Sequence, residues 1–174
     1  MVCKHIICLL PVGVNIDLSS GHLQVRGVSL EEIFLKATIT DIIEAPIDRI
    51  WAIVSDFGGL MRWHPMVVRC ETAGQGVGAL RTVHFADWWA VERLESLDAE
   101  AHVVGYAVTD CSRPQNTGVT GRITLSEAGP GRTCLEWVAG LEADNEHADV
   151  VNAALLAYYP VRIGHLRTAL GLTS

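Results

Sequence analysis

The sequence has little positive charge and no long apolar run. Among its 174 residues, 13 lysines and arginines stand against 20 aspartates and glutamates, which gives a formal net charge of -7. Nucleic acids and anionic membrane surfaces attract clustered lysine and arginine, so this balance argues against either as the main partner. No apolar stretch approaches the roughly 20 residues that a membrane-spanning helix needs. We therefore expect no nucleic-acid partner and no integral membrane protein.

Cysteine pairs at metal-binding or redox spacing are also missing. The five cysteines, Cys3, Cys8, Cys70, Cys111 and Cys134, are spread along the chain without a C-x-x-C pair. An odd and scattered set is typical of reduced thiols inside a cell, so we predict a cytoplasmic protein without a disulfide framework. Because ligand pairs at zinc spacing are lacking, we predict no metal and no other cofactor.

The composition predicts one folded domain behind an N-terminal extension. With 49% hydrophobic and 19% charged residues the chain can bury a substantial core, and we assign residues 34–172 to this domain. Residues 1–33 are predicted to be weakly structured. Their apolar stretch Ile6–Val14 could pass for a signal peptide, but it contains Pro11 and lacks a small-x-small cleavage site before Asp17. We therefore favour an extension over a secretion signal.

The segment after the first strand predicts two short helices. Residues Phe34–Ile43 alternate apolar and polar side chains, as a half-buried strand does. Pro46 suits the first position of a helix, and the apolar face of this helix comprises Ile47, Ile50, Trp51 and Val54. A second short helix, Leu60–His64, stops at Pro65, and Met66–Glu71 again favours a strand.

The rest of the chain predicts an antiparallel sheet and one long helix. Strand patterns separated by turns cover residues 79–85, 90–97, 102–109, 119–126 and 132–141. Such a sheet must bury one face, and only His147–Leu170 is long enough to cover it. The apolar stripe of this helix consists of Val151, Leu155, Tyr158, Tyr159, Ile163, Leu166 and Leu170. Pro160 should bend the helix or divide it into two shorter ones.

These elements predict an α+β protein. We expect a curved antiparallel sheet of six to seven strands wrapped around the long C-terminal helix, with the two short helices between the first two strands. A curved sheet around a helix encloses a hollow, and a hollow implies a ligand.

Five short motifs carry a family resemblance by their order and spacing. They are Ala45-Pro46 followed by Ile50-Trp51, Trp63-His64-Pro65, Gly76-x-Gly78-x-x-Arg81, Glu92-Arg93-Leu94 followed by Leu97-Asp98, and Leu135-Glu136-Trp137. Over residues 34–170 this arrangement resembles the START/Bet v 1-like superfamily, and within it the polyketide cyclase/dehydrase and lipid transport group. The resemblance implies the helix-grip fold and an internal cavity. It does not select one function, because this fold hosts hormone receptors, lipid carriers and cyclases.

A resemblance to the abscisic-acid receptors, which share the ERL-x-x-x-D strand, implies positions for single residues. His64 falls where those receptors carry the lysine that meets the ligand's carboxylate. Glu92 and Glu136 match cavity-facing glutamates of their water network. Asp87-Trp88-Trp89 falls on the gate loop, and residues 111–116 fall on the latch loop. The chain lacks the Ser-Gly-Leu-Pro gate and has no lysine at position 64, so hormone reception itself is not implied.

His64 is the first candidate for chemistry. An imidazole at one end of a cavity can bind a carboxylate or carbonyl, or move a proton, because its ordinary pKa lies near neutrality. The alternative is a histidine that caps the carbonyls of the preceding short helix.

Glu92 and Arg81 lie on neighbouring predicted strands. A carboxylate that faces an apolar cavity has a raised pKa, which suits acid/base chemistry or ligand binding. A buried charge also needs a partner, so an ion pair with Arg81 is the alternative, and both can hold together. In an enzyme, His64 and Glu92 would be the catalytic residues.

Further side chains are predicted to line the cavity. Glu136 and Trp137 alternate, so only one of them can face inward, and we expect Glu136 and Val138 to do so. The other predicted ligand contacts are Val83, Phe85, Tyr106 and Tyr159. The pair Trp88-Trp89 in a turn predicts a lid over a flat apolar ligand. The alternatives are an edge that folds back on the long helix and a homodimer contact.

We conclude that the sequence favours binding of a small hydrophobic molecule of lipid, polyketide or aromatic type, by a carrier or sensor. The alternative is a cyclase/dehydrase-like enzyme that uses histidine, glutamate and arginine for acid/base chemistry without a metal. A third interpretation is a protein with a collapsed cavity that only forms a dimer through its tryptophan pair.

Overall fold

The computed structural model describes residues 16–17, 24–25, 36–142 and 145–172. Contacts divide the chain into two units, Met1–Phe34 and Leu35–Ser174. The first unit contains the antiparallel pair β1 (Ile16–Asp17) and β2 (Gln24–Val25). The signal-like stretch of residues 6–14 lies outside the described residues, as does most of the predicted extension.

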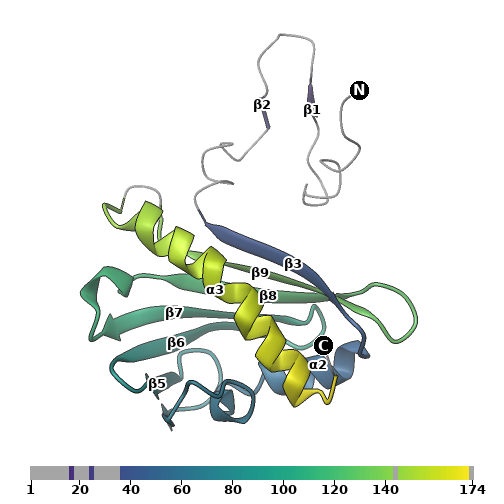
Figure 1. Cartoon of the computed structure of the whole chain (residues 1–174), viewed down its shortest axis with the longest axis horizontal. Helices are drawn as coiled ribbons and strands as arrows, with labels where there is room; N and C mark the ends of the chain where they lie inside the picture. The colour runs from purple at the N-terminus through teal and green to yellow at the C-terminus, as the bar shows by residue number, and fades with distance from the viewer. Residues whose placement is uncertain (1–15, 18–23, 26–35, 143–144, 173–174) are drawn as a thin grey trace. The chain divides into compact units, whose positions relative to one another are not determined.

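The second unit contains a seven-stranded antiparallel sheet, which confirms the predicted α+β architecture (Figure 1). Its strand order is β3-β9-β8-β7-β6-β5-β4, so the first and second strands of the unit form the two edges. The strands are β3 (Ala37–Ile43), β4 (Arg69–Ala73), β5 (Leu80–His84), β6 (Trp89–Asp98), β7 (Val103–Cys111), β8 (Thr120–Glu127) and β9 (Thr133–Gly140).

Two irregularities in the pairing of β6 with β7 bend the sheet. The register shifts once between Val91 and Glu92, where Thr109 of β7 is the extra residue, and again between Leu94 and Ser96, where Glu95 of β6 is the extra residue. Extra residues of this kind kink a strand and increase its twist. Both lie within the sheet and away from its edge strands, so they help to make the concave face that the C-terminal helix covers.

Two short helical segments connect the edges of the sheet, as the sequence predicts. Helix α2 (Ile47–Val54) begins one residue after Pro46, which takes the N-cap position instead of the first helical position. Its predicted apolar face is confirmed, because Ile50 and Val54 are buried and the other two members pack against the core. The second segment is a single 3-10 turn, η2 (Leu60–Arg62).

The predicted boundaries are wrong in two places. The strand expected over residues 66–71 begins only at Arg69, because the Val67 amide donates to the His64 carbonyl in a turn. Trp89 was expected in a turn but is the first residue of β6, where it pairs with His84. Turn-forming Pro65 explains the first shift.

Helix α3 (Ala148–Ala169) is continuous and lies across the sheet (Figure 1). Division into two helices is therefore wrong. Pro160 lies on the exposed side, where solvent can bond the carbonyl that the proline leaves free. The predicted apolar stripe is confirmed: five of its members are buried and the other two are half-buried.

Three contacts position α3 on the sheet. The ring of Tyr159 stacks on that of Trp137 in β9, with centroids 4.7 Å apart and an interplanar angle of 16°. Near the helix start, the Asn152 carboxamide accepts from the Leu141 amide at 2.9 Å. Near its end, Arg167 makes two hydrogen bonds of 2.9 Å to the Asp41 carboxylate of β3. Within the described residues, no helix has the length and apolarity needed to cross a membrane.

We predict that the inward face of α3 carries the stability of the domain. Ile163 is fully buried, whereas Val161, two residues earlier, is 49% exposed. Ile163→Ala should lower the free energy of unfolding by about 2–5 kcal/mol, because it leaves a cavity against the sheet. Val161→Ala should change it by less than about 0.5 kcal/mol. Urea denaturation of both variants checks this, and equal losses would contradict the described packing.

Candidate functional site

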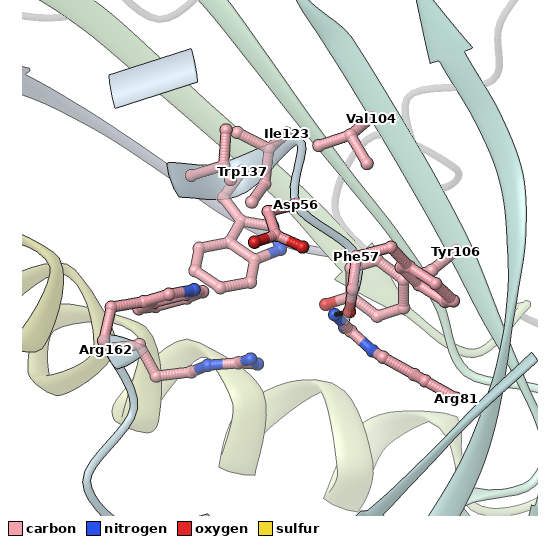
Figure 2. Close-up of a pocket in the computed structure, with 10 residues that line it drawn as sticks. Asp56, Phe57, Arg81, Val104, Tyr106, Ile123, Trp137 and Arg162 are labelled. Atoms are coloured by element: carbon pink, nitrogen blue, oxygen red, sulfur yellow. Dashed lines mark hydrogen bonds between the residues drawn. The ribbon is translucent and has the colours of Figure 1, made fainter. Parts of the chain in front are cut away.

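A small cavity of about 20 Å³ lies between the sheet, the segment around η2 and helix α3 (Figure 2). Its apolar walls are formed by Val54, Phe57, Trp63, Val104, Ile123 and Trp137. Its polar lining consists of Asp56, Arg81, Tyr106 and Arg162. A space of this size holds about one water molecule. The walls are therefore closely packed around a polar centre.

The predicted ion pair between Arg81 and Glu92 is confirmed. The two residues are direct neighbours in the register of β5 and β6, and the Arg81 Nε donates to Glu92 Oε2 at 2.5 Å. Both side chains are largely buried, at 7% and 13% exposure. The Arg81 Nη1 donates to the Phe57 carbonyl at 2.8 Å, and its guanidinium lies 4.2 Å from the centre of the Phe57 ring. The Arg81 guanidinium is therefore held by a carboxylate, a backbone carbonyl and an aromatic ring.

Tyr106 reaches the cavity because a glycine lies beside it. The ring of Tyr106 covers Gly121 of the neighbouring strand, where a Cβ atom would lie only 2.3 Å from the ring. The guanidinium of Arg81 lies 5.5 Å from the centre of the same ring. Gly121 thus lets the phenol lie flat along the sheet and face the arginine.

His64 is buried beside the cavity, with 1% of its surface exposed. Its Nε2 lies 3.3 Å from the hydroxyl of Tyr158, and its ring packs edge-on against that of His165 at 5.5 Å. Both partners belong to α3, so the imidazole faces this helix. Burial lowers the pKa of His64 to about 3, and the positive charge of Arg162 adds to the effect. The imidazole is therefore neutral at physiological pH.

Five buried polar atoms in this interior have no hydrogen-bond partner among the described residues. One belongs to the segment after η2, one to β9 and three to α3: His64 Nδ1, Trp137 Nε1, Tyr159 Oη, Arg162 Nε and His165 Nδ1. Native proteins satisfy most buried polar groups, so a cluster of exceptions needs an explanation. Burial also raises the pKa of the Tyr159 phenol, which keeps this group protonated.

Arg162 projects from α3 into the cavity lining (Figure 2). Its guanidinium lies 4.4 Å from the ring centre of Trp137 and 5.9 Å from that of Trp63. Among the described residues, no carboxylate lies within ion-pair distance of it; Asp56 pairs with Arg62, and Glu92 pairs with Arg81. Arg162 is thus held by aromatic rings and lacks a counterion there.

The expectation that Glu136 and Val138 face the cavity is wrong. Trp137 is 1% exposed and lines the cavity, and side chains alternate along a strand, so Glu136 points to the opposite face. Its register neighbours there are Thr40 and Thr124. The indole of Trp137 takes the buried side because burying its apolar ring stabilises the fold by several kcal/mol. Burying a carboxylate there would instead cost free energy.

The tryptophan pair is partly covered by its own chain. Trp88 stacks on Phe85 with ring centres 4.0 Å apart and an interplanar angle of 5°. Arg113 covers its other side, with the guanidinium 4.9 Å from the Trp88 ring centre, and makes a 2.9 Å ion pair with Asp87. Trp88 also packs against the apolar cluster under the start of α3. Trp88 and Trp89 are both half-buried, so neither is a freely exposed anchor.

The structure places only some of the ten predicted contact residues at the cavity. Arg81 and Tyr106 line it, and Glu92 touches it through Arg81. Buried beside it lie His64, Val83 and Tyr159. The residues that sequence reasoning missed as cavity lining are Val54, Asp56, Phe57, Trp63, Val104, Ile123, Trp137 and Arg162. A signal for Arg162 existed, because it lies three residues after Tyr159 within the apolar stripe of α3.

Within the described residues, no group of three histidine, cysteine, aspartate or glutamate side chains is placed to hold a metal ion. The three cysteines in that part of the chain, Cys70, Cys111 and Cys134, are free.

Comparisons with known proteins agree with this architecture. A profile of the family described as polyketide cyclase / dehydrase and lipid transport matches residues 35–171. Over 74 residues the chain is 31% identical to the abscisic acid receptor PYL7 of Arabidopsis thaliana. That match covers 40% of this chain and 35% of the receptor, so the chain spans about a third of the length of this curated relative.

Solved structures share the fold at low sequence identity. A Bacillus thuringiensis protein has a TM-score of 0.66 and 17% identity, over 77% of this chain and 97% of that one. A Nitrosospira multiformis protein has a TM-score of 0.65 and 19% identity, over 80% of this chain and 97% of the other. A Thermobifida fusca protein has a TM-score of 0.63 and 23% identity, over 76% and 91% of the two chains. These similarities show the helix-grip fold alone.

We predict that the buried His64 destabilises the protein in acid. The unfolded chain binds a proton at this position near pH 6.5, whereas the folded protein binds it only near pH 3. Between these values the unfolded state holds more protons, so stability falls as pH falls, by up to about 1.4 kcal/mol per pH unit. His64→Gln should flatten the curve of unfolding free energy over this window, and the exposed His147→Gln should not. Parallel curves for all three proteins would refute the assignment.

The Arg81–Glu92 pair gives a second prediction. Glu92→Gln leaves a buried guanidinium without its counterion, and we expect a loss of about 3–5 kcal/mol in unfolding free energy. Glu95→Gln on the same strand breaks the exposed pair with Arg93 and should cost less than about 1 kcal/mol. Chemical denaturation of both variants measures the difference. Similar small losses would mean that the buried pair does not hold β5 to β6.

Proposed function

Because the chain belongs to the polyketide cyclase/dehydrase and lipid transport family, we propose that it binds a small hydrophobic molecule between the sheet and helix α3, as a carrier or sensor. One observation supports this above all. Two of the five unpartnered polar atoms belong to Trp137 and Arg162, which line the aromatic-walled cavity, and the other three belong to His64, Tyr159 and His165, whose rings contact Trp63, Trp137 or each other. A ligand with an apolar body and an oxygen function matches both features.

The size of the cavity sets a condition on binding. A space of about 20 Å³ holds a water molecule but no hydrophobic ligand, so the ligand must displace side chains or move α3. In the stacked pair of Phe85 and Trp88, Phe85 packs against the main core and Trp88 against the apolar cluster beneath the start of α3. We propose that this pair, with Trp89, is the gate that opens for the ligand.

The predicted contact residues divide into two roles in this proposal. Tyr106 and the Arg81–Glu92 pair offer polar atoms at the sheet side of the cavity. The side chains of Val83 and Tyr159 supply buried walls, and neutral His64 supplies a hydrogen-bond partner facing α3.

The enzyme alternative draws less support from the geometry. The Glu92 carboxylate is bound by Arg81, so it is not a free base. The lowered pKa of His64 leaves this imidazole neutral near pH 7, so it lacks the imidazolium proton that a general acid transfers. Acid/base catalysis through these two residues would need both environments to change on substrate binding.

We predict that filling the cavity abolishes ligand binding. Val104 lines the cavity, whereas its neighbour Val103 points to the other face of β7. Val104→Phe should cost about 1–3 kcal/mol of stability through overpacking and weaken binding of naphthalene-sized compounds at least about tenfold. Val103→Phe should leave the affinity within about twofold. Isothermal titration calorimetry with neutral and acidic naphthalene derivatives, supported by native mass spectrometry, measures the affinities.

Two results would count against the proposal. One is that no compound of the series binds the wild-type protein or raises its melting temperature. The other is that Val104→Phe, confirmed as folded by circular dichroism, binds as well as Val103→Phe.

A further inference from the structure

The unpartnered polar groups at and beside the cavity differ in whether they can donate or accept hydrogen bonds. The indole Nε1 of Trp137 and the Nε of Arg162 can only donate hydrogen bonds. The Tyr159 hydroxyl and the two imidazoles can each donate or accept, according to rotamer and tautomer. At least two donors therefore lack acceptors, and no unpartnered group of the cluster is restricted to accepting. A ligand that completes the cluster must bring acceptors.

The charges around the cavity also favour a ligand that brings acceptors, and specifically an anion. The guanidinium of Arg81 is compensated by the Glu92 carboxylate, and the carboxylate of Asp56 is compensated by Arg62. Arg162 is left with a positive charge and, among the described residues, no carboxylate within ion-pair distance. A half-buried charge without a counterion is costly, and an anion beside it removes this cost.

We propose that Arg162 anchors a carboxylate, and that the ligand class is therefore hydrophobic carboxylic acids. This inference rests on the proposed function and names the chemistry of its ligand. A carboxylate only accepts hydrogen bonds, offers about four acceptor positions and fits the planar donor array of a guanidinium. The Arg162 guanidinium already lies 4.4 Å from the Trp137 ring centre, and this contact restrains the side chain before a ligand arrives, which lowers the entropy lost on binding.

The position of Arg162 suits this role better than that of Arg81. Figure 2 shows the two side chains approaching the same space from opposite sides, Arg162 from α3 and Arg81 from the sheet. The Nε and Nη1 of Arg81 already donate to Glu92 and to the Phe57 carbonyl. The apolar body of the acid would lie against the indole walls of Trp63 and Trp137.

A matched pair of ligands tests the inference. Naphthalene-2-carboxylic acid and its neutral amide share the apolar body and differ in charge. We expect the wild-type protein to bind the acid about ten- to a hundredfold more tightly than the amide. Arg162→Met keeps the length of the side chain but removes the charge, and it should abolish this preference while changing the affinity for the amide less than about twofold. Arg162→Lys should keep part of the preference, because it keeps the charge without the planar fork.

The control is Arg122→Met, which removes an exposed arginine of β8. It should leave the preference for the acid unchanged, because a solvent-exposed charge is screened by salt. Calorimetric titrations at a fixed salt concentration compare the four proteins. If acid and amide bind the wild type equally, or if Arg162→Met retains the preference, the role of Arg162 is overturned while hydrophobic binding stands. If no compound of the series binds, the proposed function fails together with this inference.

The melting temperature of Arg162→Met also distinguishes a ligand-binding role of this arginine from a purely structural one. An arginine needed for packing or pairing would destabilise the protein when replaced. An uncompensated charge kept for a ligand should be replaceable by methionine with an unchanged or raised melting temperature. A large fall in the melting temperature of Arg162→Met would count against the ligand role.

Discussion

The stack of Tyr159 on Trp137 is the contact on which the interior depends. Both side chains are almost fully buried, and their rings join the middle of α3 to the central part of β9. Once this pair is fixed, the helical repeat sets the direction of the residues that follow, so Arg162 and His165 lie along the same inner surface. Within the described part of the chain, the indole N–H of Trp137 has no hydrogen-bond partner, at a cost of about 1–3 kcal/mol. The stack therefore holds the helix by close packing, although it does not satisfy all of its own polar groups.

The two sides of the cavity differ in how far their polar groups are satisfied. On the sheet side, Arg81 has its carboxylate, its carbonyl and an aromatic ring in place before any ligand arrives. On the helix side, three of the five unpartnered atoms belong to α3. A satisfied network is rigid and serves as a scaffold, whereas unsatisfied groups gain free energy when a partner appears. Under the proposed function, this asymmetry makes α3 the surface that responds to the ligand and the sheet the surface that positions it.

The sequence predicted features that follow from local pattern and missed those that depend on distant contacts. The apolar stripe of α3 and the sheet of alternating strands follow from periodicity, and the Arg81–Glu92 pair follows because adjacent strands place a buried charge beside its opposite. Glu136 was misplaced because a resemblance was preferred over hydrophobicity, although the burial of Trp137 is worth far more. Arg162 was missed because an arginine on a helix usually extends to solvent, whereas here its guanidinium lies against the rings of Trp137 and Trp63. The helical repeat could place Arg162 on the inner face of α3, but no local pattern encodes the distant contacts that keep its charge there.

The small cavity and the unsatisfied helix side have one physical consequence in common. A ligand larger than water can enter only if lining side chains or α3 itself move, and a movement of α3 must break part of the packing that holds the helix. Binding can shift the protein towards the open form only by as much as the ligand prefers that form. The unpartnered donors supply such a preference, because their hydrogen bonds are absent from the closed form and can be made in the occupied one. Under the proposed function, ligand binding and the position of α3 are therefore coupled through the same few side chains, and a sensor needs this coupling more than a passive carrier does.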